Sequence, residues 1–268
     1  MKKLILDMCR KIKNRVSTKN LLRFYIFVLR FSRRPRSKPI LEQKVNNFKI
    51  DIADGPSFVY QYKDIFVDQA YKFSSSHATP NIIDCGSNIG LSILYFKSQY
   101  PTANIIGIEA DPAIFKFLEK NILKNNSLEN VKLINKAVWI NAAGVSFQPD
   151  GADGGRLDQN GKEKIASLRL KEILDDFDYI DMLKIDIEGA EGDVLLDCGS
   201  SLKKVDNLFF EYHSLKDKKQ NLSLILQTLE NLGFRYFIES ISHSASPFIN
   251  QSSGDMDLQL NIYCRREL

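Results

Sequence analysis

Three acids and a lysine gather at the end of one apolar segment of the sequence. Lys184 and Asp186 come at the carboxyl end of a predicted buried strand, and Glu188 and Glu191 begin the helix expected next. Charged groups at a buried strand end cost desolvation energy, so their presence indicates a site that binds or moves charge. Acids at a helix start also favour the helix dipole, and Glu188 and Glu191 each fit that structural role as well.

A second predicted strand, residues 207–213, also ends in polar side chains, Glu211 and His213. Histidine titrates near neutral pH, so His213 suits a general base that accepts a proton from a substrate. We hypothesise that Asp186 or Glu211 orients His213 and that Lys184 stabilises developing negative charge. The alternative is a strand-end histidine that bonds only to backbone.

A glycine turn precedes these segments. Residues 81–85 form a short apolar run, Gly86 and Gly90 follow, and residues 91–99 are typical of a helix. Glycines let the backbone approach a ligand, and a helix start offers free N–H groups, although an ordinary strand-to-helix turn has the same pattern. Glu109 ends the next strand, 19 residues after Gly90. That is close to the interval at which doubly wound folds place a carboxylate on ribose hydroxyls, which we favour over a solvated strand-end acid.

The elements that must position these residues alternate between strand and helix. Strands are expected near 81–85, 104–109, 130–135, 179–185, 207–213, 234–241 and 258–265, with the last antiparallel to its neighbour. Alternation of this kind predicts an α/β fold with a mostly parallel sheet covered by helices on both faces. Ligands bind beyond the carboxyl ends of such strands. The residues expected on that one rim are Asp84, Gly86, Glu109, Ala137, Asp186, Glu211 and His213.

Two regions depart from this alternation. Residues 46–62 alternate apolar and polar around Gly55-Pro56 and predict a hairpin or short edge strands, followed by a helix over 64–73. Residues 145–148 and 165–168 predict a strand pair around a Gly-rich loop, 150–161. A long Gly-rich loop is either a lid over a substrate or plain exposed chain.

Four segments, in this order, resemble the FkbM-type family of S-adenosylmethionine-dependent methyltransferases. They are Asp84-Cys-Gly-Ser-Asn-Ile-Gly90, Ile108-Glu-Ala-Asp-Pro112, Leu183-Lys-Ile-Asp-Ile-Glu-Gly-Ala-Glu191 and Phe210-Glu-Tyr-His213. The resemblance covers about residues 80 to 240. The usual Val-Gly-Ala-Asn of the family is Cys85-Gly86-Ser87-Asn88 here, which keeps the glycine and the asparagine.

The resemblance implies a class I methyltransferase fold, which is Rossmann-like and seven-stranded. It also implies S-adenosylmethionine as cofactor, with Asp84, Gly86, Asn88 and Gly90 around its methionine portion. Glu109 would hold the ribose hydroxyls, Ala110 and Ala137 would lie near adenine, and Asp186 beside the sulfonium. Studied members of the family methylate hydroxyl oxygens, so the expected acceptor is a hydroxyl-bearing small molecule, sugar or glycan.

Methyl transfer to an alcohol requires help with the proton, because an alcohol is a poor nucleophile near neutral pH. Besides a proton acceptor such as His213, Mg²⁺ held by Asp186 and Glu211 is a second way to activate the hydroxyl, which we favour less.

A nucleic-acid methyltransferase is one alternative function. However, no Asn/Asp-Pro-Pro-Tyr/Phe segment, which is typical of amino-methylating nucleic-acid enzymes, follows the fourth strand. A nicotinamide-dependent oxidoreductase is another alternative, but Gly86-Ser-Asn-Ile-Gly90 lacks the G-x-G-x-x-G spacing. A binding module without catalytic activity is a third alternative.

The charge of the chain is unevenly distributed. Residues 1–38 contain thirteen Lys or Arg and one acid, giving +12, so residues 39–268 carry −8 against the total of +4. We expect a basic amphipathic arm over 1–45 and a methyltransferase domain over 46–268. The apolar run 21–31 is too short to span a bilayer. The arm suits an anionic membrane surface, the surface of its own domain or nucleic acid, and we favour the membrane.

The sequence also indicates a cytoplasmic protein. Charges at Asp7, Arg10 and Lys11 interrupt the apolar core that a secretory signal needs. The four cysteines are widely separated in sequence and lack C-x-x-C spacing, so we expect reduced and mostly buried thiols.

Overall fold

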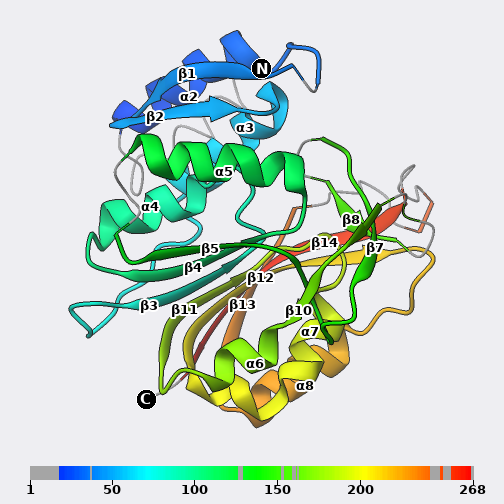
Figure 1. Cartoon of the computed structure of the whole chain (residues 1–268). Coiled ribbons are helices and arrows are strands. Elements are labelled where there is room, and N and C mark those ends of the chain that lie inside the picture. The colour runs from blue at the N-terminus through cyan, green and yellow to red at the C-terminus, as the bar shows by residue number, and fades with distance from the viewer. Residues whose placement is uncertain are drawn as a thin grey trace.

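The computed structural model describes residues 18–36, 38–125, 129–151, 154–158, 161, 163–241, 248–249 and 255–266. A seven-stranded sheet crosses the molecule in the order β13-β14-β12-β11-β3-β4-β5 (Figure 1). Its strands are β3 (Asn81–Cys85), β4 (Asn104–Glu109), β5 (Val131–Asn135), β11 (Ile180–Ile185), β12 (Val205–Leu215), β13 (Phe234–Ser240) and β14 (Met256–Arg266). Strand β14 runs antiparallel to β12 and β13, and the other paired strands of this sheet are parallel. This arrangement confirms the predicted α/β class I methyltransferase fold.

The order of the strands fixes where a ligand can bind. From β3 the chain moves to β4 and β5 on one side, and it returns to β11 and β12 on the other side. Strands β3 and β11 therefore flank the switch point of the sheet, with Asp84 opposite Lys184 in register. The carboxyl ends of strands at a switch point leave a crevice, so the glycine turn after β3 and Asp186 after β11 must meet there.

Helices cover both faces of the sheet (Figure 1). Helices α4 (Leu91–Gln99) and α5 (Pro112–Lys124) lie on one face, and α6 (Leu170–Asp175), α7 (Glu191–Cys198) and α8 (Leu222–Asn231) lie on the other. Side chains of a strand alternate between the faces, so Ile82 packs into one buried cluster and Ile83 into the second. Helix α5 begins with Pro112 in its first turn, and Asp111 accepts from two backbone N–H groups.

A further layer lies over α5 and is built from residues 18–67. It contains α2 (Thr18–Phe31), the antiparallel strands β1 (Ile40–Val45) and β2 (Phe48–Ile52), α3 (Gly55–Tyr62) and the π-helix η1 (Lys63–Val67). Strand β2 docks on α5 because the Asn121 amide accepts from the backbone of Asp51 at 2.7 Å and donates to its carbonyl at 2.9 Å.

The prediction for this layer was partly wrong. The hairpin exists, but Phe58 and Tyr60 lie on helix α3 and not on a strand. Asp54 caps that helix by accepting from Ser57, and Pro56 sits in its first turn. The following helix was predicted over 64–73, whereas η1 ends at Val67.

Short strands form two small sheets beside the main one. Strand β7 (Val145–Gln148) pairs with β8 (Arg156–Leu157) and with β9 (Glu163–Ile165). Strands β6 (Ala137–Trp139) and β10 (Ser167–Arg169) pair in parallel. The predicted strand 165–168 is thus two strands, since the Ala166 carbonyl accepts from Ala137 and turns the chain away from β7. Residues 152–153, 159–160 and 162 of the predicted loop lie outside the described residues.

Other boundaries also shift. Strand β12 continues past the predicted residue 213 to Leu215, which still pairs with Met256 of β14, and α8 begins at Leu222. A 3₁₀-helix, η2 (Gly199–Lys204), leads from α7 into β12. Cys85, Cys198 and Cys264 are buried free thiols, as predicted, while Cys9 lies outside the described residues. Within the described part of the chain, no helix combines the length and apolar composition needed to cross a bilayer.

Candidate active site

A cavity of about 360 Å³ opens at the carboxyl ends of β3, β4, β11 and β12. The residues singled out in the sequence that line its walls are Gly86, Asn88, Glu109, Ala110, Ala137, Asp186, Glu188 and Glu211. The others, Asp84, Gly90, Lys184, Glu191 and His213, do not line it.

The glycine turn closes tightly against the end of β11. Gly86 has φ +80, and a Cβ added there would lie 1.8 Å from the carbonyl oxygen of Asp186. The Asp186 N–H donates to the Cys85 carbonyl at 3.1 Å. Only glycine fits this position, and the contact brings Asp186 to the floor of the cavity.

Glu109 is held by backbone donors at the end of β4. Its two carboxylate oxygens accept from the N–H groups of Asn88 and Asp111, each at 2.8 Å. Asn88 reaches this position in a left-handed conformation, with φ +47. Burial raises the pKa of Glu109 to about 7, although these hydrogen bonds oppose the rise. Glu109 lines the cavity, and a carboxylate has further lone pairs that can accept from hydroxyl groups.

Lys184 and Asp84 form a buried brace behind the turn. The Lys184 ammonium donates to the carbonyl of Gly86 at 2.6 Å and lies 3.5 Å from both Asp84 and Asp186. Burial alone would lower the pKa of Lys184, but Asp186 and Asp84 raise it. The ammonium is therefore a fixed positive charge that holds the turn and the end of β11 together.

Gly90 has a packing role at the start of α4. It adopts φ +91, and a Cβ there would lie 2.8 Å from Leu118 of α5. The residue thus lets the first turn of α4 pack against α5. Its conformation aims the start of α4 at the cavity wall formed by Asn88.

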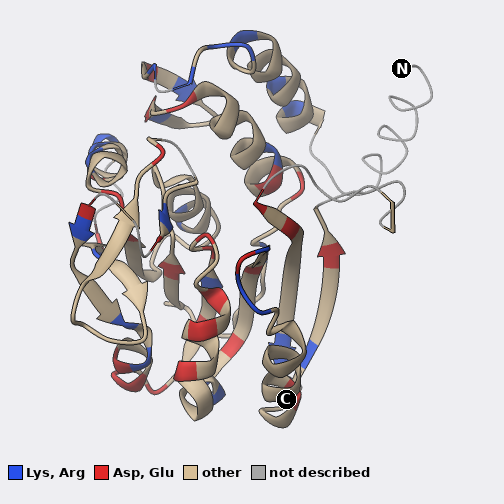
Figure 2. Ribbon diagram, turned by 90° about the vertical axis from the view of Figure 1, so that its right-hand side faces the viewer, with Lys and Arg blue, Asp and Glu red and all other residues tan. Residues whose placement is uncertain are grey.

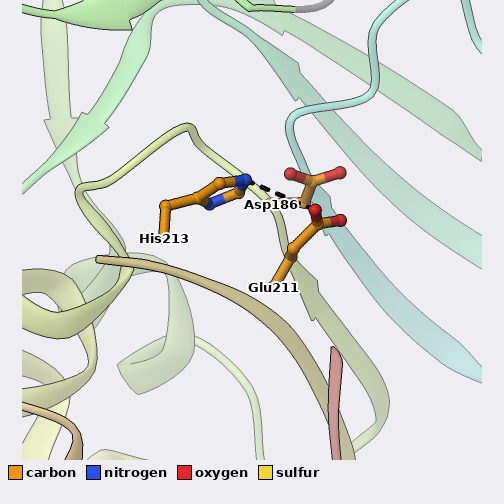
Figure 3. A group of neighbouring side chains, drawn as sticks. All are labelled: Asp186, Glu211 and His213. Carbon is orange, nitrogen blue, oxygen red and sulfur yellow. Dashed lines mark ion pairs between the residues drawn. The ribbon is translucent and has the colours of Figure 1, made fainter. Parts of the chain in front are cut away.

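The ring of His213 faces the carboxylates of Glu211 and Asp186 (Figure 3). The His213 side chain is 1% exposed, and Nε2 points toward Glu211 at 3.4 Å and Glu188 at 3.5 Å. On the opposite side of the ring, Nδ1 lies 3.0 Å from Glu191. Glu191 therefore holds the ring at Nδ1, while Glu211, one of the two partners hypothesised from the sequence, contacts it at Nε2.

Sequence analysis connected Glu191 with the start of a helix and not with His213. It is buried, and its carboxylate also accepts from the backbone N–H groups of Ile187 and Gly189. These bonds fix the turn that carries Glu188, which has a left-handed φ of +56. One buried acid thus positions both His213 and the loop after Asp186.

Burial and neighbouring charges shift the pKa values of His213, Glu211 and Asp186 in different directions. Burial alone would lower the pKa of His213, but Glu191, Glu211 and Glu188 raise it well above its ordinary value. Burial alone would raise the pKa of Glu211, but its hydrogen bond with His213 lowers it. Burial raises the pKa of Asp186 to about 6 despite the nearby Lys184. Near neutral pH, Glu211 is thus an ionised carboxylate beside an imidazolium.

Among the described residues, one set of potential metal ligands converges, and it consists of Asp186, Glu211 and His213. One ligand atom from each lies within 4.8 Å of the others. Two carboxylates and an imidazole suit Mn²⁺ or Fe²⁺ better than Mg²⁺, which prefers oxygen ligands.

The far wall of the cavity comes from segments that the sequence did not connect with a site. Tyr60 and Gln61 of α3 and Asp64 of η1 line it, together with Leu157 of β8 and Gln259 of β14. Helix α3 was predicted as a strand, so no sequence pattern placed these side chains near Asp186. Gly155 and Leu157, from the 150–161 region, also line the cavity.

The comparisons with known proteins agree with this geometry. A family model described as "Methyltransferase FkbM domain" matches residues 84–236, more than half of the chain. Methyltransferase sdnD of Sordaria araneosa is 27% identical over 217 residues, covering 67% of this chain and 78% of that protein. Methyltransferase 1 of Beauveria bassiana is 28% identical over 207 residues, covering 66% and 81%.

Among solved structures, the chain is similar to a methyltransferase FkbM from Methylobacillus flagellatus KT. The two share 16% identity with a TM-score of 0.49, over 78% of this chain and 50% of that one.

Proposed function

The chain belongs to the FkbM-type family of S-adenosylmethionine-dependent methyltransferases, and we propose that it methylates a hydroxyl group of a sugar or glycan-type acceptor. The observation that supports this most is the composition of the cavity. One end presents Glu109, held by backbone N–H groups, to a nucleoside, and the other presents the ionised Glu211 to a group that must lose a proton.

In this proposal the residues near β3 and β4 hold S-adenosylmethionine. The turn from Asp84 to Gly90 surrounds the methionine portion, and Glu109 accepts from the ribose hydroxyls. Ala110 and Ala137 offer small apolar surface to the adenine ring. Asp186, whose side chain is 25% exposed, provides negative charge beside the sulfonium. When bound, the cofactor supplies the methyl group on a positively charged sulfur.

The acceptor then occupies the wall formed by Tyr60, Gln61 and Asp64. Its hydroxyl oxygen must align with the methyl carbon and the sulfur for an in-line displacement. The S–CH₃ bond breaks, an O–CH₃ bond forms, and the sulfur becomes a neutral thioether. The hydroxyl proton must leave in the same step or the next.

We propose Glu211 as the group that contacts this proton. It lines the cavity, whereas His213 is sealed behind it. His213 was the base hypothesised from the sequence, and its refined role is to hold Glu211 in place and keep it ionised. Glu191 fixes the ring of His213 from the other side. Glu211, His213 and Glu191 thus form a carboxylate–imidazole–carboxylate chain, and in this proposal Glu211 is the member that contacts the hydroxyl group to be methylated.

A divalent metal ion is a second candidate for activating the hydroxyl, because Asp186, Glu211 and His213 converge. Those three residues would hold it, and it would lower the pKa of a bound alcohol. Turnover that survives excess chelator would exclude this variant. Turnover lost to chelator and restored by Mn²⁺ or Mg²⁺ would support it.

Two rival classes make different predictions. A nicotinamide-dependent oxidoreductase would bind NAD. A nucleic-acid methyltransferase would bind RNA or DNA with an affinity that falls steeply with salt.

We further propose that the enzyme works in the cytoplasm, at the inner face of a membrane.

The proposed function is tested by a transfer assay with S-adenosylmethionine carrying a labelled methyl group. Extracted glycans and lipids serve as acceptors, and mass spectrometry locates the methyl group on the product. We expect label on a hydroxyl oxygen of a sugar. Label on nitrogen or on nucleic acid would contradict the proposal.

A further inference from the structure

Helix α2 is apolar on two opposite faces. Its inner face buries Phe27 and Phe31 against the rings of Phe58 and Tyr62, with centroid distances of 4.9 to 5.8 Å. Its outer face exposes a stripe of four large apolar residues: Leu22, Tyr25, Ile26 and Leu29. Leu22 is 64% exposed and Leu29 is 85% exposed. The inner contacts explain why the helix lies on the domain, and they leave the outer stripe unexplained.

The outer stripe has the spacing of a single helical face. Its members follow one another at intervals of three, one and three residues, so they lie side by side along the helix surface. A helix that is apolar all round is normally buried on every side. A contiguous exposed patch of this kind marks a contact surface for a partner.

The surroundings of the outer stripe are positively charged. Lys19 and Arg30 flank it on the helix, and Arg33 and Arg34 follow directly, all exposed. The segment 18–38 contains seven Lys or Arg and no acid. Figure 2 shows basic but no acidic residues along α2 and the loop after it, whereas acidic residues are spread over the rest of the molecule. A partner for this surface must therefore be apolar and negatively charged.

We propose that the outer stripe inserts into the interface of an anionic lipid bilayer, with α2 lying parallel to the membrane plane. Leucine, isoleucine and tyrosine then enter the boundary between headgroups and acyl chains, and the basic side chains contact lipid phosphates. A second copy of this chain fits less well, because symmetric pairing of two such helices brings basic residues against basic residues. Nucleic acid offers phosphates but no apolar layer for the leucines.

This surface lies close to the acceptor side of the cavity. Helix α2 packs on α3 through Phe27 and Phe58, and α3 carries Tyr60 and Gln61 on the cavity wall. Docking through the outer stripe thus places the acceptor wall one helix away from the bilayer. Resting on the proposed function, this arrangement favours an acceptor that is itself carried by a membrane.

The test is sedimentation of the full chain with vesicles. Phosphatidylcholine vesicles and vesicles that also contain phosphatidylglycerol are compared at low and high salt. We expect binding to the anionic vesicles only, weakened by salt. The double variant Leu22→Gln/Leu29→Gln should bind about tenfold more weakly or worse, from lost apolar burial.

A matched control is Leu123→Gln/Leu224→Gln, which changes two leucines, 56% and 51% exposed, on helices α5 and α8. It should bind vesicles like the unmodified chain. Equal binding by both double variants, or no binding by the unmodified chain, would overturn the proposal. A dimer that the first double variant converts to monomer without lipid would instead assign the stripe to a second copy.

The same samples are titrated with S-adenosylhomocysteine. Retained titration in the variants shows that the fold is intact. It also separates a failure of membrane docking from a failure of the proposed function.

Discussion

The two halves of the cavity are built in different ways. The cofactor half comes mainly from one continuous stretch, residues 84–110, in which backbone N–H groups and tight turns define the shape, and Ala137 and Asp186 complete it. The acceptor half is assembled from side chains on α3, η1, β8, β11, β12 and β14, which are far apart in sequence. The first half is encoded locally and the second by tertiary packing. A shared cofactor and a variable acceptor would produce this difference.

The halves also differ in how they use charge. Glu109 accepts hydrogen bonds from two backbone N–H groups, whereas Glu211 contacts His213, which contacts Glu191 in turn. Substitutions in the acceptor half should therefore change turnover while cofactor affinity is retained. Substitutions in the cofactor half should change affinity first.

The largest effect is expected for Glu211→Gln. The amide keeps the size of the side chain but cannot accept the hydroxyl proton. Turnover should fall by about 100- to 10,000-fold, the usual range for loss of a general base. The dissociation constant of S-adenosylhomocysteine, measured by calorimetry, should stay within about twofold, which corresponds to less than about 0.5 kcal/mol.

Glu239→Gln, on the exposed part of β13, is the control and should retain full turnover. Equal losses of turnover and affinity in Glu211→Gln would remove the distinction between the halves.

A smaller but still large effect is expected for Gly86→Ala. The added Cβ meets the Asp186 carbonyl at 1.8 Å and is strained at φ +80. The clash and the strained backbone together cost about 3 kcal/mol or more. If the fold persists, this corresponds to about a 100-fold loss of affinity for S-adenosylhomocysteine.

The control for this change is Gly233→Ala. Gly233 has φ +84 and no atom within 4 Å of an added Cβ, so it reports backbone strain without the clash. It should lower the thermal midpoint slightly and leave binding unchanged. Equal affinity in the two alanine variants would show that the turn does not shape the cofactor half.

The smallest effect is a pH dependence from Glu109. Its pKa of about 7 lies above the ordinary value, and ribose hydroxyls donate to its ionised form. The dissociation constant of S-adenosylhomocysteine should therefore rise as the pH falls below about 7, by at most about tenfold per pH unit, and stay level above it. Glu109→Gln should bind more weakly and show no such slope.

Asp186 supplies an internal comparison, since its pKa of about 6 changes the charge beside the sulfonium. S-adenosylmethionine should lose more affinity than S-adenosylhomocysteine as the pH falls, because only the former carries the positive sulfur. Identical slopes for the two ligands would place the sulfur away from Asp186.

What the sequence predicted follows the same division. Gly86 and Glu109 were singled out because each depends on neighbours a few residues away or on a strand-to-strand interval typical of the fold. Helix α3 was missed because Phe58 and Tyr60 alternate like a strand, although Asp54 and Pro56 are ordinary start signals for a helix. The Glu191–His213 contact joins α7 to β12 across 22 positions, and only packing reveals it.

The claim that the cavity holds S-adenosylmethionine is tested most directly by calorimetric titration of the full chain. S-adenosylhomocysteine and NAD are titrated separately at pH 8, above the Glu109 transition. The account predicts saturable binding of one S-adenosylhomocysteine per chain, weakened by Glu109→Gln, and no heat from NAD. Binding of NAD, or the absence of S-adenosylhomocysteine binding by the folded chain, would contradict it.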